Sequence, residues 1–211
     1  MKCPRIYTEF QAIDGKTEPF EFVSPYIPAG SHCHLLFKAK ATTGDSSGDE
    51  VLVKVVKRAY GEQAHRLAAE NGFAPKLYGV AQVDGAPPAY VMEFLSEAKG
   101  WVPPRGRSFK SPQQWDKFEA EIKKFLEFLQ KYDLVHGDLR RDNMLVQVQD
   151  DDVKLRVIDW DWAGEFGTAR YPLNRNPEAN LPGNAGGLID VDHDRSTLLE
   201  HFQKVKASPL L

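Results

Sequence analysis

Runs in which apolar residues alternate with polar ones fill the first half of the chain and predict β-strands. Turn-forming stretches such as TTGDSSGD and DGAPP separate these runs. The segments that fit the pattern are residues 20–23, 34–41, 50–56, 76–83 and 89–95. One helix is predicted at residues 60–72 (YGEQAHRLAAENG), where apolar positions share a face and Gly72 suits the helix end. The predicted order is three strands, one helix and two strands.

The second half begins with a longer amphipathic pattern at residues 111–134. Aromatic and aliphatic residues recur there mostly every three or four positions, which predicts a helix. Ser111 is the expected N-cap, and Pro112 suits the first helical position. The remaining predicted elements are two short strands and a last helix, at residues 143–148, 154–160 and 192–205.

The composition is that of a globular protein. The chain has 211 residues, of which 42% are hydrophobic and 27% charged, enough to bury a core. The net charge of -3 gives no reason to expect nucleic acid or an anionic membrane as a partner, since both attract a basic excess. Cys3 and Cys33 are too few for a disulfide framework, and the start MKCPRIYTEF lacks the apolar run of a signal peptide. We therefore expect a cytoplasmic protein.

The segment LVHGDLRRDNMLV, residues 134–146, places charged and amide side chains between apolar ends. Phosphoryl transfer requires a carboxylate near the acceptor hydroxyl, oxygen ligands for magnesium and a cation near the phosphates. Asp138 is the candidate base, and Arg140 beside it is a candidate cation. Asn143, together with Asp159 in the downstream segment IDWDWAG, is a candidate metal ligand. The alternative is that Asp138 and Asn143 only form turns by bonding the local backbone.

Upstream, Lys54 interrupts the apolar run LVKVV on the face opposite Val53 and Val55. Its ammonium suits the α- and β-phosphates of a nucleotide, although an ordinary edge-strand lysine is the alternative. A helix acid is expected to hold this lysine, and Glu62 is the preferred candidate over Glu70. Glu62 also fits a solvated i,i+4 ladder of charges with Arg66 and Glu70, so the two interpretations remain open.

These segments, taken in order, resemble the protein-kinase-like superfamily. The resemblance rests on VKVV, YGEQAHRLAAENGFAPKLYG, YVMEFL, HGDLRRDN and VIDWDWAG, which together span about residues 50–165. Within the superfamily the chain resembles the aminoglycoside phosphotransferase and choline kinase branch more than the protein kinases proper. It looks most similar to small fungal kinase-like proteins with HGD and DWAG signatures.

The resemblance implies an α+β, two-lobed protein-kinase-like fold. Residues 1–95 would form an N-lobe with an antiparallel five-stranded sheet and one helix, and residues 96–211 a reduced, mainly helical C-lobe. It also implies that ATP and Mg²⁺ are the cofactors, with the metal between the phosphates, Asn143 and Asp159. The residues expected to contact ATP are Gly30, Ser31, Lys54, Glu93, Phe94 and Leu95.

The chain also departs from the family pattern. The expected phosphate loop, AGSHC, has one glycine, and Gly137 stands where many protein kinases have an arginine that reads a phosphorylated activation loop. The chain ends soon after DWAG, where relatives have further acceptor-binding helices.

The favoured function is an ATP- and Mg²⁺-dependent phosphotransferase acting on a hydroxyl of a protein or small molecule. The alternative is a nucleotide-binding pseudokinase or scaffold. The acidic group at residues 190–194 is expected to start the last helix rather than to bind a second metal.

Overall fold

A computed structural model describes residues 3–27, 35–42, 48–57, 59–174 and 182–208. The chain forms two compact units. The first consists of Met1–Ala59 and Pro75–Phe94, and the second of Tyr60–Ala74 and Leu95–Leu211. The division near residue 95 resembles the expected lobe boundary, but the helix expected in the first lobe is part of the second unit.

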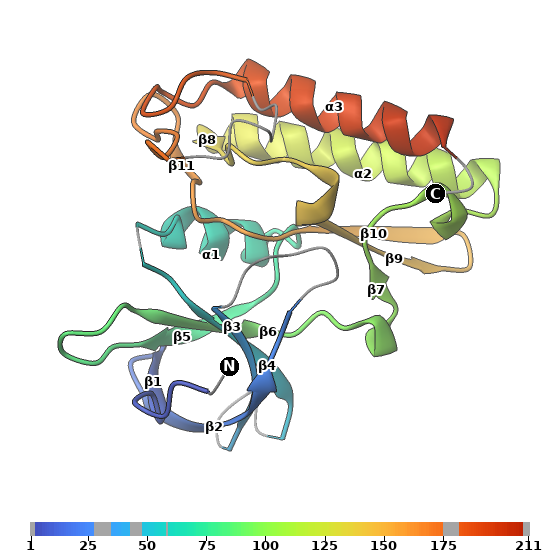
Figure 1. Cartoon of the computed structure of the whole chain (residues 1–211). Helices are drawn as coiled ribbons and strands as arrows, with labels where there is room; N and C mark the ends of the chain where they lie inside the picture. Colours follow the sequence, from blue (N-terminus) through green and yellow to red (C-terminus); the bar gives the residue numbers. More distant parts are fainter. Residues whose placement is uncertain (1–2, 28–34, 43–47, 58, 175–181, 209–211) are drawn as a thin grey trace. The chain divides into compact units, whose positions relative to one another are not determined.

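The first unit is a closed antiparallel barrel (Figure 1), with strand order β1-β2-β3-β4-β6-β5. The ring closes because β1 pairs with β5, placing Gln11 opposite Val80. The expectation of a five-stranded sheet was wrong, since β1 is a sixth strand. The bounds are β1 Glu9–Ala12, β2 Thr17–Pro25, β3 Leu36–Ala41, β4 Glu50–Val55, β5 Leu77–Ala81 and β6 Ala89–Glu93.

The barrel interior explains the alternation along its strands. In β4 the buried positions are Val51, Val53 and Val55, whereas Lys54 between them is half-buried on the other face. Phe10, Phe20 and Phe37 are among the aromatic residues of the core. Because successive side chains of a strand point to opposite faces, burying the valines fixes the face on which Lys54 lies.

The second unit contains all three α-helices of the described chain. Their bounds are α1 Glu62–Glu70, α2 Pro112–Lys131 and α3 Val191–Ala207. As the sequence predicts, the Ser111 side chain caps α2 by accepting the Gln114 N–H at 3.2 Å. Asp190 caps α3 in the same way through the Asp192 N–H at 2.9 Å. Helices α2 and α3 lie side by side (Figure 1).

Two small sheets and three 3₁₀ helices complete the described part of the second unit. The larger sheet has the order β10-β9-β7, and its β9–β10 hairpin is in register from the Met144–Val157 pair to the Gln149–Asp152 pair. The smaller sheet pairs β11 with β8. The strand bounds are β7 Trp101–Val102, β8 Leu134–Val135, β9 Met144–Gln149, β10 Asp152–Val157 and β11 Gly164–Glu165. The 3₁₀ helices are η1 Glu97–Lys99, η2 Gly106–Ser108 and η3 Arg141–Asn143.

Helix α1 joins the second unit through its N-terminus. The Gly61 N–H donates to the Trp160 carbonyl at 3.0 Å, and a Cβ at Gly61 would lie 2.4 Å from the Ala163 carbonyl oxygen. Only glycine permits this approach. His65 of the same helix stacks on Trp160 with ring centroids 6.0 Å apart. The start of α1 is thereby fixed against the turn that follows β10.

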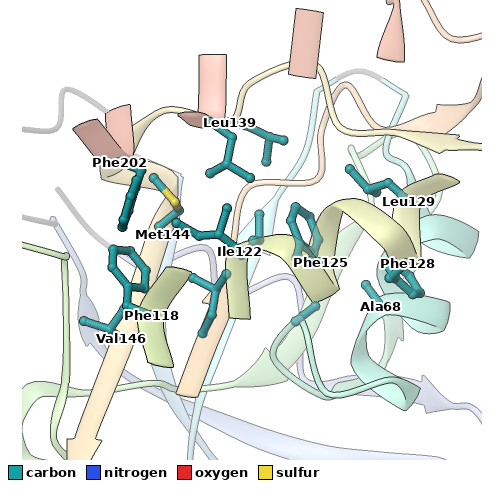
Figure 2. Packing of buried hydrophobic residues seen from close by; sticks show 14 of the residues in the cluster. Ala68, Phe118, Ile122, Phe125, Phe128, Leu129, Leu139, Met144, Val146 and Phe202 are labelled. Atoms are coloured by element: carbon teal, nitrogen blue, oxygen red, sulfur yellow. The ribbon is translucent and has the colours of Figure 1, made fainter. Parts of the chain in front are cut away.

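One hydrophobic cluster supports the second unit. It combines the inner faces of α1, α2 and α3 with the β9–β10 hairpin. Figure 2 shows Leu139 and Met144, which flank the 3₁₀ helix η3, in this cluster with Ile122 and Phe125 of α2. The segment that carries the candidate catalytic residues is therefore anchored in the core. Among the helices of the described chain, none is both long and apolar enough to cross a bilayer.

Candidate active site

The candidate catalytic loop begins directly after β8. Gly137 adopts φ +82°, and a Cβ at this position would lie 2.7 Å from the Ile189 side chain. A side chain here would be strained by its backbone and would collide with a fully buried isoleucine. This explains why glycine, rather than the arginine of many protein kinases, stands between His136 and Asp138.

His136 is a structural brace for this loop. Its ring is fully buried and lies edge-on to Trp160, with centroids 4.8 Å apart. The Asp138 N–H donates to Nδ1 at 3.2 Å, so Nδ1 carries no proton. Nε2 is then the protonated nitrogen and donates to the Ile158 carbonyl at 3.2 Å. The imidazole is neutral in this arrangement, and it connects the loop to the turn after β10.

Asp138 is buried and forms a bidentate ion pair with Arg140. Nε of Arg140 lies 2.5 Å from Oδ1 of Asp138, and the second guanidinium nitrogen lies 2.8 Å from Oδ2. The Asp138 side chain is 6% exposed and that of Arg140 is 35% exposed. Hydrogen bonding to Asp138 raises the pKa of the Arg140 guanidinium, which remains charged. The two predicted catalytic residues are thus in direct contact.

Asn143 connects the candidate base to the candidate metal turn. Its Nδ2 donates to the Asp138 carbonyl at 3.0 Å. Its own carbonyl accepts the Ile158 N–H at 2.9 Å, which places the residue before Asp159 beside it. Asp159 is exposed, adopts φ +67°, and contributes to raising the pKa of Arg140 through its charge. The structure therefore brings together the four candidate site residues of the second unit, which are Asp138, Arg140, Asn143 and Asp159.

The amide oxygen of Asn143 and the carboxylate of Asp159 are the oxygen donors that Mg²⁺ prefers. Since Nδ2 is engaged with the Asp138 carbonyl, Oδ1 is the atom available for a metal. Within the described ranges, no group of three or more His, Cys, Asp or Glu side chains could hold a metal ion. Magnesium is usually bound by one or two protein ligands together with phosphate oxygens and water, so the pair Asn143 and Asp159 stays a prediction.

Asp194 is a site residue that the sequence did not reveal. Its side chain, on the first turn of α3, is 2% exposed and accepts the N–H groups of His136 at 2.5 Å and Gly137 at 2.8 Å. Burial raises the pKa of its carboxyl to about 7. The acidic run at residues 190–194 was expected only to begin the helix, and Asp190 does so as its N-cap. Which other acid of the run faces the protein depends on how α3 packs.

The first unit contains most of the candidate nucleotide-binding residues. Lys54 lies on β4 opposite Leu36 and Tyr90 in the neighbouring strands. Glu93 ends β6, and its carboxylate accepts the Lys76 N–H at 3.2 Å. Phe94 is buried. Leu95, the next residue of the expected adenine site, is also buried and begins the second segment of the second unit. Gly30 and Ser31 of the expected phosphate loop lie outside the described residues.

Glu62 makes the contact that the alternative interpretation predicts. One of its carboxylate oxygens accepts two hydrogen bonds from the guanidinium of Arg66, at 2.9 and 2.7 Å. Glu62 and Lys54 belong to different units, so their pairing stays a prediction.

Sequence comparison identifies the family. A model of the RIO domain matches residues 41–166, more than half of the chain. The chain belongs to the RIO domain family. The matched range of this RIO domain includes Lys54, Asp138, Asn143 and Asp159. No curated protein matches the sequence.

A solved structure shares the fold. The structure of the Cydia pomonella Granulovirus kinase PK-1 matches with a TM-score of 0.63 and 16% sequence identity. The match covers 89% of the RIO domain chain and 68% of the viral kinase. Both findings support the protein-kinase-like superfamily that the sequence predicts. They do not support the narrower placement in the aminoglycoside phosphotransferase and choline kinase branch.

Proposed function

We propose that this RIO domain protein is an ATP- and Mg²⁺-dependent phosphotransferase that moves the γ-phosphate of ATP to a hydroxyl group. The observation that carries the proposal is the pair of hydrogen bonds made by Asn143. One reaches the Asp138 carbonyl, and the other fixes the residue before Asp159. Asn143 is therefore hydrogen-bonded both to the backbone of the candidate base and to the residue before the second candidate metal ligand, and phosphoryl transfer depends on such positioning.

In the proposed mechanism, Asp138 orients the acceptor hydroxyl and accepts its proton as the oxygen attacks the γ-phosphorus, while the bond from that phosphorus to the β–γ bridging oxygen breaks and ADP leaves. Arg140 holds the Asp138 carboxylate in position, and its charge stabilises negative charge on the transferring group. Asn143 and Asp159 would hold Mg²⁺, which would neutralise phosphate charge.

For the first unit we propose that Lys54 contacts the α- and β-phosphates and that Glu62 holds it. The backbone at Gly30 and Ser31 would cradle phosphate, and adenine would bind near Glu93, Phe94 and Leu95. The acceptor is a protein or small-molecule hydroxyl, and the reaction takes place in the cytoplasm. These roles follow from the kinase-like fold and the sequence order of the residues.

One observation favours an alternative. Both carboxylate oxygens of Asp138 are engaged by Arg140, so an acceptor hydroxyl must share or replace one of these hydrogen bonds. A nucleotide-binding pseudokinase or scaffold would tolerate a permanently occupied aspartate. This alternative predicts binding of Mg-ATP without phosphoryl transfer.

The deciding experiment follows γ-labelled ATP in the presence of the whole chain. The phosphotransferase proposal predicts label transfer to the protein, to an added hydroxyl acceptor or to water, and predicts that chelation of Mg²⁺ abolishes it. The scaffold alternative predicts saturable Mg-ATP binding while the label stays on ATP under every acceptor condition.

A further inference from the structure

A cavity of about 390 Å³ opens beside the catalytic loop within the second unit. Its walls come from three separate segments: the start of η2, the 3₁₀ helix η3 and the C-terminal half of α3. The charged and titratable side chains that line it are Arg105, Arg140, Arg141, Asp142, His201 and Lys204. This lining contains four permanent cations and one acid.

Apart from the ion pair of Arg140, the ion pairs made by the cations of the lining are exposed and weak. Arg141 lies 3.5 Å from Asp142, and both side chains are exposed. Lys204 pairs with Glu200 at 2.6 Å on the helix surface, with side chains 61% and 59% exposed. Exposed pairs of this kind contribute little stability, so a bound anion can replace them.

Arg105 is the cation with the weakest local compensation. No carboxylate lies within ion-pair distance of its guanidinium among the residues that the structure describes. Its side chain is half-buried, and its backbone is fixed by the turn in which the Ser108 N–H donates to the Arg105 carbonyl at 2.9 Å. The guanidinium is therefore presented from a fixed backbone to the cavity.

His201 also lines the cavity, and it lies close enough to two of the cations to be affected by their charge. Burial lowers the pKa of its imidazole, and the charges of Lys204 and Arg141 lower it further. Glu200 and Asp142 act in the opposite direction, and the net shift remains downward. The C-terminus of α3 adds partial negative charge, equivalent to roughly half an elementary charge, which is less than the excess of cations in the lining.

We propose that this cavity binds an oxyanion, phosphate or carboxylate, on the molecule whose hydroxyl receives the phosphoryl group. Arginine forks match the two oxygens of such a group. Arg140 both lines the cavity and pairs with Asp138, so the bound anion lies one side chain away from the candidate base. The inference rests on the proposed function and gives the acceptor a chemical class, an acidic hydroxyl compound.

The first test measures anion binding without turnover. Inorganic phosphate is titrated into the labelled whole chain while backbone amide NMR signals of Arg141, Asp142 and Lys204 are followed. We expect saturable shifts, and we expect the double variant Arg105→Gln/Arg141→Gln to weaken binding by about tenfold or more. The matched control is Arg107→Gln on the exposed side of η2, outside the cavity lining. Shifts that do not saturate, or equal weakening by the control, would overturn the inference.

The second test uses transfer from ATP and separates the two sources of the anion. One arm offers glycerol 3-phosphate, and the other offers a serine peptide flanked by glutamates. For whichever acceptor receives the γ-phosphoryl group, the double variant Arg105→Gln/Arg141→Gln should raise the acceptor KM by about tenfold. Its Mg-ATP affinity should stay unchanged. Phosphate binding at the cavity without any transfer would refute the proposed function but retain the anion site. Transfer with an unchanged acceptor KM in the double variant would refute the anion site alone.

Discussion

Asp138 in the second unit and Lys54 in the first are positioned by different kinds of structure. Asp138 lies in an irregular loop, where its backbone and side chain bond to His136, Arg140 and Asn143. Lys54 lies on a regular strand, where two barrel neighbours and the buried valines beside it set its face and register.

The difference shows where the site is sensitive to substitution. A strand can keep Lys54 in place through many combinations of apolar neighbours, because the pattern alone sets its direction. The loop depends on individual groups, such as the missing side chain of Gly137 and the buried carboxylate of Asp194. Substitutions in the loop of the second unit should therefore lower both the stability of that unit and the turnover of the proposed enzyme.

The largest effect is expected from Leu139→Ala, because Leu139 is fully buried in the loop that carries Asp138. Removing it should lower the free energy of unfolding by about 2–5 kcal/mol. All four tryptophans lie in the second unit, so tryptophan fluorescence during denaturant unfolding reports on that unit. Leu199→Ala on α3, where the side chain is 39% exposed, is the control and should cost under about 1 kcal/mol. A similar small cost for Leu139→Ala would show that the loop is not anchored in the core.

Asp159→Asn should come next. Asparagine tolerates the φ of +67° at this position, so the backbone should be retained while the metal-binding charge is lost. We expect Mg²⁺-dependent turnover to fall by about 100-fold, because phosphate charge in the transition state is left uncompensated. Asp142→Asn removes an equal charge from an exposed position nearby and should leave Mg-ATP affinity unchanged. Equal turnover in Asp159→Asn and wild type would remove Asp159 from the metal site.

Asp194→Asn tests the anchor between α3 and the loop. The carboxyl group presents one oxygen to each of the two N–H groups, whereas the amide must turn its NH₂ group toward one of them, so at pH 5 the variant should be less stable by about 1–3 kcal/mol.

The same variant should also change the pH dependence of stability. The pKa of Asp194 is raised in the folded protein to about 7 from an ordinary value of 3.8. The folded state therefore binds more protons than the unfolded state between these values, and this contribution to stability is lost as pH rises from about 4 to about 7. Stability measured from pH 4 to 8 should fall in the wild type relative to Asp194→Asn. Parallel curves for the two proteins would contradict the shifted pKa.

The smallest effect concerns the pair on α1. Glu62→Gln and Arg66→Gln should each lower the free energy of unfolding by only about 0.3–0.5 kcal/mol. The double variant should show the coupling of a half-exposed i,i+4 pair.

If Glu62 also holds Lys54, Glu62→Gln and Lys54→Met should reduce turnover non-additively. Non-additivity in stability with full additivity in turnover would restrict Glu62 to its contact with Arg66.

The predicted elements succeeded where a long periodic pattern decided the structure. Helix α2 begins at Pro112 after the Ser111 cap, as its sequence indicates. The alternation around Lys54 likewise predicted its strand and its face. In these elements the local pattern and the packing agree.

Elements that depend on distant partners were missed. Strand β1 spans four residues, of which only Phe10 is buried, and it exists because β5 and β2 pair with its two edges. Strands β8 and β11 have two residues each, too few for a period. The candidate catalytic loop was proposed from its residue types and spacing, whereas the contacts of Asp194 depend on the packing of α3, and this residue lies 57 positions beyond Gly137. Sequence could name the candidate site residues but not the side chains that anchor them.

The most direct test of the central claim compares Asp138→Asn with wild type for ATP turnover and Mg-ATP binding on the same preparations. In the proposed site Asp138 contacts the acceptor hydroxyl rather than ATP, so nucleotide affinity should stay within about twofold while turnover falls by about 100-fold or more. Asp142→Asn, the neighbouring charge-matched control, should retain nucleotide affinity and ATP hydrolysis in the absence of acceptor. Wild-type turnover in Asp138→Asn would contradict the account.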